Sequence, residues 1–103
     1  MTWDDARERI AKFPDTSSVR GDSLGICGYL EVSCHEPPDD VFIGSVGMIK
    51  LIWGTDGDYR QYIEIGPGLG VSSFMIKENK HTQFKSIYDF IANYECQHDM
   101  AGS

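Results

Sequence analysis

The chain has few basic residues and no long apolar run, and each shortage excludes a class of function. Nine Lys and Arg residues stand against sixteen Asp and Glu residues, which leaves a formal net charge of −7. Nucleic-acid binders gain much of their affinity from Lys and Arg on phosphates, so we expect no direct contact with nucleic acid. No stretch approaches the roughly 20 apolar residues of a membrane-spanning helix. The polar, acidic first residues also lack a signal-peptide pattern, so we expect a cytoplasmic protein without a membrane partner.

The spacings typical of disulfide frameworks and metal sites are missing as well. Three cysteines are an odd number that does not predict a disulfide framework, and reduced thiols are typical of cytoplasmic proteins. Structural zinc sites usually show a C-x₂₋₄-C spacing, which is absent here. Neighbouring residues of a strand point to opposite faces, so Cys34 and His35 are not expected to share an ion. We therefore expect no metal site among the candidate ligands, which are Cys27, Cys34, His35, His81, Cys96 and His98.

Glycine-rich stretches are present, but they lack the rest of a cofactor motif. The glycines of 66–70 form G-x-G-x-G, whereas a dinucleotide-binding loop needs G-x-G-x-x-G between a strand and a helix. The residues that follow are typical of a strand, and Pro67 has no backbone N–H to offer a phosphate. We interpret 66–70 as a hairpin corner, and Asp56-Gly57 as a second hairpin turn. The chain also has no G-x-S-x-G nucleophile elbow, so we expect neither a cofactor nor an enzyme.

Helical periodicity marks both ends of the chain. Trp3, Ala6, Ile10 and Phe13 recur every three or four residues and predict an amphipathic N-terminal helix. Apolar residues at the same spacing predict a C-terminal helix over 82–96. We interpret 14–23 as a loop and 78–81 as a turn, because both are rich in turn-forming residues.

Alternation between apolar and polar residues predicts the strands that lie between these helices. The predicted strands are 24–34, 59–65 and 71–77, and 41–54 forms either one central strand or two short strands around its glycines. The fold class is therefore α+β, with one domain over 1–103. We expect an antiparallel β-meander of four or five strands, with the N-terminal and C-terminal helices packed on one face.

A strand face that carries tyrosine and mixed charge is the candidate partner-binding site. Alternation places Arg60, Tyr62 and Glu64 on one face of their strand, and Tyr29 and Glu31 on one face of 24–34. Tyr and Arg are enriched in interfaces, because both bury large contact areas and also form hydrogen bonds. The same residues also suit an ordinary solvated face, where cross-strand pairs stabilise the sheet. Which face the helices cover stays open, since a register slip of one residue exchanges the two faces.

The leading hypothesis is a small, acidic, non-enzymatic protein-binding module. Such a chain fits an inhibitor or neutralising partner of the immunity, antitoxin or phage anti-defence type, and its charge favours a basic protein as partner. One alternative is a small-molecule-binding domain or small enzyme, with a pocket between sheet and helices lined by Trp53, Tyr59, Phe74 and Tyr94. Another is a self-associating structural subunit, such as a homodimer, that pairs the apolar stretch 41–53 with a second copy.

Overall fold

Two helices, five strands and a last helix follow one another along the described part of the chain. The computed structural model describes residues 1–12, 19–33, 35–44, 47–56, 59–66, 70–77, 80–84 and 86–94. The helices are α1 (Trp3–Ala11), α2 (Val19–Val32) and α3 (Ile87–Asn93). The strands are β1 (Asp40–Ile43), β2 (Ile49–Asp56), β3 (Tyr59–Gly66), β4 (Gly70–Lys77) and β5 (Lys80–Phe84). None of these helices is both long and apolar enough to cross a membrane.

The five strands form one antiparallel sheet in which each strand pairs with its neighbour in the sequence. Their order is β1-β2-β3-β4-β5, and every pair is antiparallel. The short connections account for this arrangement, because parallel neighbours need a crossover of about a dozen residues or more. The predicted α+β fold, with an antiparallel meander and helices at both ends, is confirmed, and the number of strands is five.

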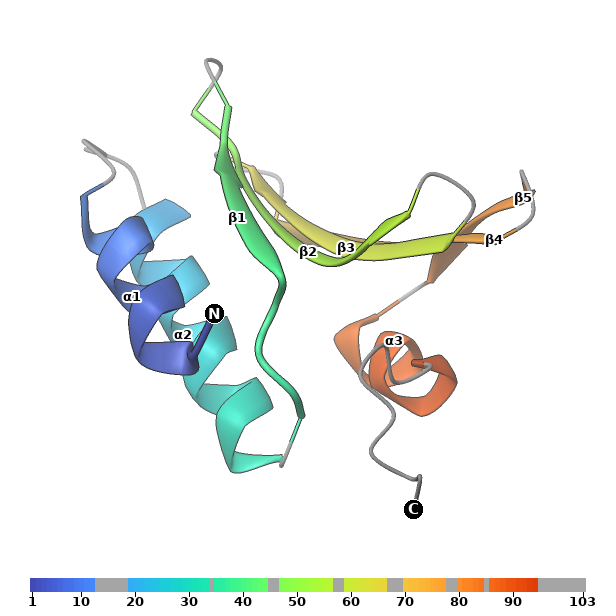
Figure 1. The fold of residues 1–103 in the computed structure, drawn as a ribbon, viewed down its shortest axis with the longest axis horizontal. Helices are drawn as coiled ribbons and strands as arrows, with labels where there is room; N and C mark the ends of the chain where they lie inside the picture. Colours follow the sequence, from blue (N-terminus) through green and yellow to red (C-terminus); the bar gives the residue numbers. More distant parts are fainter. Residues whose placement is uncertain are drawn as a thin grey trace.

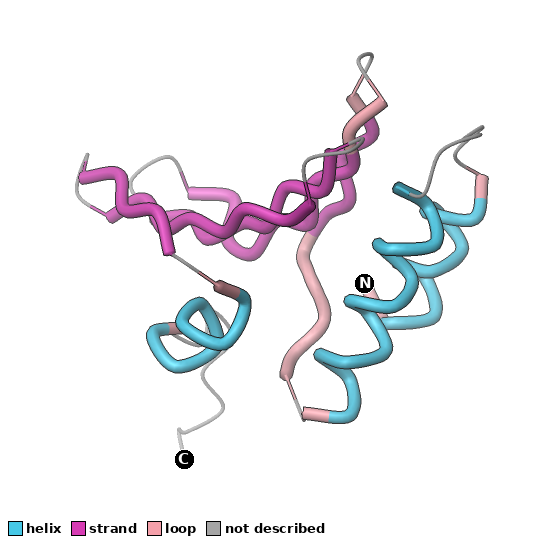
Figure 2. The backbone as a smooth tube through the Cα atoms, turned by 180° about the vertical axis from the view of Figure 1, so that it is seen from behind, coloured by secondary structure: helices cyan, strands magenta, loops and turns pink. Residues whose placement is uncertain are grey.

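All three helices lie on the same side of the sheet, which is below the sheet in Figure 1 and again in the reverse view of Figure 2. Alternate side chains of β2 and β3 point towards the helices and form the core with them. Ile49, Leu51 and Trp53 of β2 are fully buried, as are their neighbours Ile63 and Ile65 of β3. The opposite side of the sheet carries no described helix, and we call it the open face. The helices contribute to the core Trp3, Ala6, Ile10, Val19, Cys27, Leu30 and Phe90.

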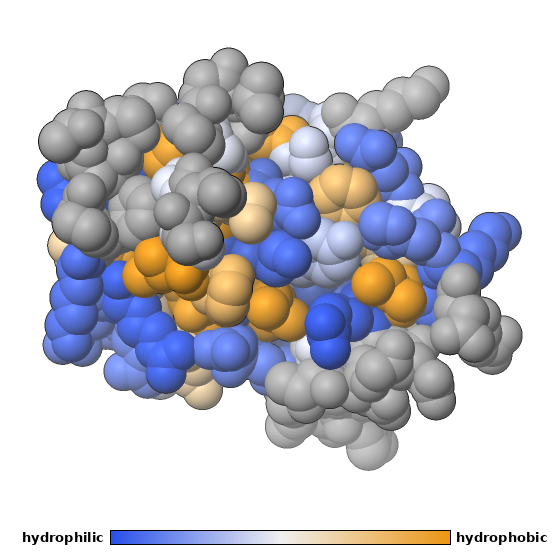
Figure 3. Space-filling view, turned by 90° about the horizontal axis from the view of Figure 1, so that it is seen from above, coloured by the Kyte–Doolittle hydropathy of each residue, from blue (hydrophilic) through white to orange (hydrophobic). Residues whose placement is uncertain are grey.

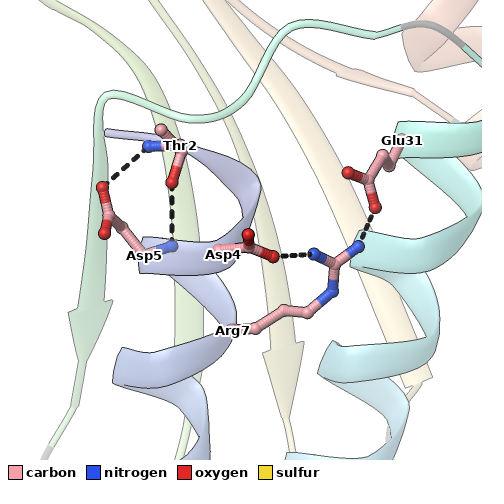
Figure 4. A network of polar contacts seen from close by, with 5 residues as sticks. All are labelled: Thr2, Asp4, Asp5, Arg7 and Glu31. Carbon is pink, nitrogen blue, oxygen red and sulfur yellow. Dashed lines mark hydrogen bonds and ion pairs between the residues drawn. The ribbon is translucent and has the colours of Figure 1, made fainter.

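The first helix forms where the helical spacing predicted it. Thr2 caps α1, because its Oγ1 accepts the backbone N–H of Asp5 at 3.1 Å. The Asp5 carboxylate in turn accepts the backbone N–H of Thr2 at 3.0 Å, as Figure 4 shows. This reciprocal arrangement satisfies two donors that would otherwise lack partners at the start of the helix. The predicted apolar stripe is buried as far as Ile10, and Phe13 lies outside the described residues.

The prediction of a strand over 24–34 is wrong, because this stretch belongs to α2 as far as Val32. The helix also takes in 19–23, which we expected to be loop. Three glycines within α2 lower its helix propensity, and the alternation around Leu30 resembles that of a strand. Tertiary packing decides the outcome, since one side of the helix is apolar or small at a helical spacing. The buried residues of α2 are Val19, Ser23, Cys27 and Leu30.

The C-terminal helix is shorter than predicted. Residues 82–84 form the end of β5 instead of its first turn, and Lys80 and His81, expected in a turn, belong to the same strand. The helix begins after Ser86, whose Oγ accepts the backbone N–H of Asp89 at 3.2 Å. A serine at this position is a strong start signal, because its side-chain oxygen accepts an N–H group of the first turn that has no partner within the helix. The predicted residues 95 and 96 lie outside the described part of the chain.

Tight hairpins join the central strands. Asp56 pairs with Tyr59 across the predicted Asp-Gly turn, and Gly66 pairs with Gly70 across the glycine-rich corner. A strand follows 66–70, so no helix begins there to receive a phosphate; residues 57–58 and 67–69 themselves are outside the described residues. The apolar stretch 41–54 holds two strands, one of the two options left open, and Gly47 between them has a φ of 80° that favours glycine.

Candidate binding face

The strand register places side chains from all five strands on the open face. Tyr62 of β3 stands between Ile52 and Phe74, and Glu64 stands between Lys50 and Ser72. Arg60 lies opposite Ile76. Arg60, Tyr62 and Glu64 therefore share one face, as alternation along β3 predicted. The open face comprises Asp40, Phe42, Lys50, Ile52, Arg60, Tyr62, Glu64, Ser72, Phe74, Ile76, His81 and Gln83.

The structure does not bring Tyr29 and Glu31 to this face. Both lie on α2, and residues two apart on a helix do not share a side. The Tyr29 ring packs edge-on against Tyr88 of α3, with 5.7 Å between the ring centroids. Glu31 forms an ion pair with Arg7 of α1, which Figure 4 shows beside the cap of that helix. The prediction that these two residues extend the sheet face is wrong, because it depended on a strand that is a helix.

Three stacked rings give the open face a rigid centre. The centroid of Tyr62 lies 4.9 Å from that of Phe74, and the centroid of Phe74 lies 5.1 Å from that of His81. The three rings are nearly parallel, with interplanar angles of 22° and 24°. The Tyr62 hydroxyl and His81 Nε2 are 2.9 Å apart and share a hydrogen bond. Burial raises the pKa of Tyr62, and the nearby Glu64 carboxylate adds to this effect, so the hydroxyl stays neutral.

Lys50 and Glu64 form a cross-strand pair above this centre. Lys50 Nζ lies 3.4 Å from Glu64 Oε1 and 4.7 Å from the centroid of the Tyr62 ring. An ammonium over an aromatic face gains from the ring quadrupole as well as from the carboxylate. Glu64 is therefore occupied by a neighbour within the sheet, which is the stabilising role that cross-strand pairs usually have.

Arg60 lines two hollows of the open face. The larger hollow, of about 300 Å³, is lined by two aromatic and two isoleucine side chains together with Lys50 and Arg60. The smaller, of about 140 Å³, lies against Asp40 and Gly54. The Nε atom of Arg60 is buried and has no hydrogen-bond partner in the described part of the chain. Figure 3 looks down on the open face and shows apolar side chains set among hydrophilic ones. The aromatic and isoleucine residues that line the larger hollow are Phe42, Tyr62, Ile52 and Ile76.

Another surface hollow, of about 450 Å³, lies between α2 and α3. Tyr29 and Tyr88 line it, and Tyr88 is 68% exposed. Asp22 is its charged lining residue. This α2–α3 hollow competes with the open face as a binding surface, but none of the described residues that line it has a buried donor without a partner.

Aromatic residues on the helix side of the sheet fill the core. The Trp53 ring contacts His35 and Phe90, with centroid separations of 5.3 and 5.5 Å, and its Nε1–H donates to the Glu36 carbonyl at 2.9 Å. Trp53 and Tyr94 lie on the helix side, whereas Phe74 belongs to the open face. These residues therefore do not line one pocket as the small-molecule alternative required, and the side chain of Tyr59 lies outside the described part of the chain.

The candidate metal ligands and nucleophiles are dispersed where the structure describes them. Cys27 is a free, buried thiol of α2, and burial raises its pKa to about 11. It is therefore protonated and unreactive at neutral pH. His35 lies in the core, and His81 lies on β5. Among the described residues no three His, Cys, Asp or Glu side chains form a metal-binding group; Cys34, Cys96 and His98 fall outside this part of the chain.

Sequence reasoning missed Phe42, Ile52, Ile76 and His81, which complete the open face. Their inclusion follows from the strand register. Counting back from the Asp-Gly turn would have placed Ile52 on the wrong face, because the pairing of β2 with β3 shifts by one residue between Trp53 and Asp56. The chain has no match among protein-family models, curated proteins or solved structures.

Proposed function

We propose that the chain is a non-enzymatic protein-binding module that holds its partner on the open face. The observation that carries this proposal is the cluster of apolar side chains around Arg60, in which Phe42 is exposed and its neighbours are partly buried. Phe42 is 51% exposed, and the partly buried Ile52 and Ile76 line the same hollow. Exposed apolar residues gathered in one place and mixed with charge are typical of interaction sites.

The rigidity of the open face supports the same conclusion. Each interior strand is paired on both sides, and the Tyr62, Phe74 and His81 rings hold one another in place. A surface that is already ordered loses little conformational entropy when a partner binds. Binding energy from the exposed side chains is then available for affinity.

The biological role that fits this module is inhibition or neutralisation of another protein. The net charge of −7 gives long-range attraction to a basic partner, while Lys50 and Arg60 place positive charge at the point of contact. The free thiol of Cys27 is consistent with a reducing, cytoplasmic location. Immunity proteins, antitoxins and phage anti-defence proteins share this size and acidity, so the comparison with them is an analogy based on these two properties.

Two matched aromatic substitutions test which surface binds. Phe42→Ser removes an exposed ring from the open face, and Tyr88→Ser removes one from the α2–α3 hollow. Tagged wild type and both variants are used to capture partners from lysate of the native host, and recovery is quantified by mass spectrometry. We expect Phe42→Ser to reduce recovery of a stoichiometric partner about tenfold or more, as loss of an interface anchor does. Tyr88→Ser should leave recovery unchanged.

The opposite pattern, loss with Tyr88→Ser and retention with Phe42→Ser, would contradict the proposal. Light scattering at tens of micromolar is needed beside the capture. A wild-type dimer that Phe42→Ser converts to monomer would favour the self-associating alternative, because the open face would then be covered by a second copy.

A further inference from the structure

Arg60 brings an unsatisfied donor to the open face. Its Nε is buried and has no hydrogen-bond partner in the part of the chain that the structure describes. Nearby carboxylates are already engaged. Glu64 is paired with Lys50, and Arg9 Nη1 lies 2.7 Å from Asp40 Oδ1. A buried donor without a partner is costly, and an acceptor removes this penalty if it reaches Nε itself as well as a terminal nitrogen of the guanidinium.

The surroundings of Arg60 select the chemistry of that ligand. The larger hollow combines the Arg60 guanidinium and the Lys50 ammonium with Phe42, Ile52 and Ile76. Apolar walls reduce the local dielectric and strengthen a charged hydrogen bond. A guanidinium offers two parallel N–H donors that match the two oxygens of a carboxylate. The smaller hollow on the other side of Arg60 is lined by Asp40, which repels an anion.

We propose that the larger hollow, which we name the Arg60 hollow, binds an Asp or Glu side chain of a protein partner, with an apolar neighbour of that residue against Phe42. This assignment rests on the proposed function and identifies its point of recognition. Charge complementarity with Arg60 requires an anion, and the exposed ring of Phe42 requires an apolar group beside it. The net charge of −7 repels extended polyanions such as nucleic acid and acidic membranes, which leaves a single carboxylate on a mixed protein surface.

Displayed peptides supply a defined probe for the Arg60 hollow. A random peptide library is panned on the full chain, and selected peptides are synthesised for calorimetry. Each peptide is measured against wild type, Arg60→Gln, Arg60→Lys, Phe42→Ser, Tyr88→Ser and Lys80→Gln, of which the last removes an equal charge from the exposed end of β5. The same peptides are also made with their Asp or Glu replaced by the amide. This second change uses wild-type protein, so it is independent of how any variant folds.

Three results are expected if the Arg60 hollow takes a carboxylate. Selected peptides share an acidic position next to an apolar one. The amide peptide and Arg60→Gln each weaken binding about 10- to 100-fold, the range for a hydrogen bond to a charged group. Their combination weakens binding little further, because both remove the same contact. Arg60→Lys restores part of the affinity, and Lys80→Gln has no effect.

Two other results would overturn the assignment in different ways. Peptides that depend on Phe42 but tolerate both the amide change and Arg60→Gln would refute the carboxylate site and leave the proposed function standing. Peptides that ignore Phe42 and Arg60 altogether, or bind only at the α2–α3 hollow, would refute both.

Discussion

Tyr62 contacts three neighbours at once and sets the positions of the residues around it. Its ring stacks on Phe74, its hydroxyl bonds to His81, and Lys50 lies above its face. Tyr62 itself is only 8% exposed. In the proposed interface its contribution is therefore support for the exposed side chains, and substituting it would disturb the sheet as well as that interface. Arg60 and Phe42 are the better probes of binding, since Phe42 is exposed and Arg60 Nε has no hydrogen-bond partner among the described residues.

We expect protonation of His35 to lower the stability of the protein in mild acid. Its ring is packed against Trp53, Phe90 and Tyr94, and burial lowers its pKa below the ordinary value of 6.5, an effect that the nearby Glu36 partly opposes. The unfolded chain then binds a proton at a higher pH than the folded chain does. We expect no contribution to pH dependence well above pH 6.5, and a falling free energy of unfolding as the pH drops from 6.5 towards the folded pKa.

Urea unfolding at a series of pH values between 7.5 and 5 measures this effect. His35→Phe keeps an aromatic ring in the core and removes the titrating group, so its unfolding free energy should depend less on pH across this range than that of wild type. The two slopes are compared, rather than the absolute stabilities. Equal slopes would mean that His35 is protonated as readily in the folded chain as in the unfolded one.

At the scale of single elements, local signals identified those helices and strands whose pattern has only one interpretation. Thr2 and Asp5 mark the start of α1, and Ser86 marks the start of α3. In α2 the glycines weaken the helical signal, and packing of its buried side against β2 and β3 determines the structure. Thr82 is also a residue that can cap a helix, but pairing with β4 places 82–84 in a strand instead. Such tertiary effects are not contained in a local pattern.

The candidate site divides in the same way. Arg60, Tyr62 and Glu64 are two residues apart on one strand, so period-two alternation alone groups them. Phe42, Ile52 and His81 join them only through pairing between strands, which needs each hairpin register. Tyr29 and Glu31 were assigned to the face because the type of their element was predicted wrongly.

Two glycines should respond in opposite directions to alanine. Gly25 lies within α2, and a Cβ added there meets no atom within 4 Å. Gly25→Ala should stabilise the protein by about 0.5–1 kcal/mol, because alanine has less backbone freedom to lose and a higher helix propensity. Gly47 has a φ of 80° between β1 and β2, so Gly47→Ala should destabilise by about 1–2 kcal/mol.

Chemical denaturation of the two alanine variants checks both values. Gly25→Ala is also informative about the helix assignment, since alanine favours a helix over a strand. A Gly25→Ala variant less stable than wild type would contradict the open space beside α2.

For the whole molecule, charge acts differently at long and short range. The chain is acidic overall, and its field attracts a basic partner from a distance. The Arg60 hollow, where we propose that the partner makes contact, carries positive charge through Lys50 and Arg60. A partner that suits both the acidic chain and the basic hollow would have a positive net charge and would present one acidic side chain at the interface. This arrangement allows attraction to set the association rate while the Arg60 contact sets specificity.

Hydroxyl-radical footprinting of the chain with its captured partner tests the central claim most directly, because it reports the exposure of individual side chains. The account predicts that the partner strongly reduces oxidation of Phe42 on the open face and leaves Tyr29 and Tyr88 in the α2–α3 hollow as reactive as in the free chain. Protection of Tyr29 and Tyr88 with Phe42 unchanged would contradict it, and would place the partner on the helices instead of the sheet.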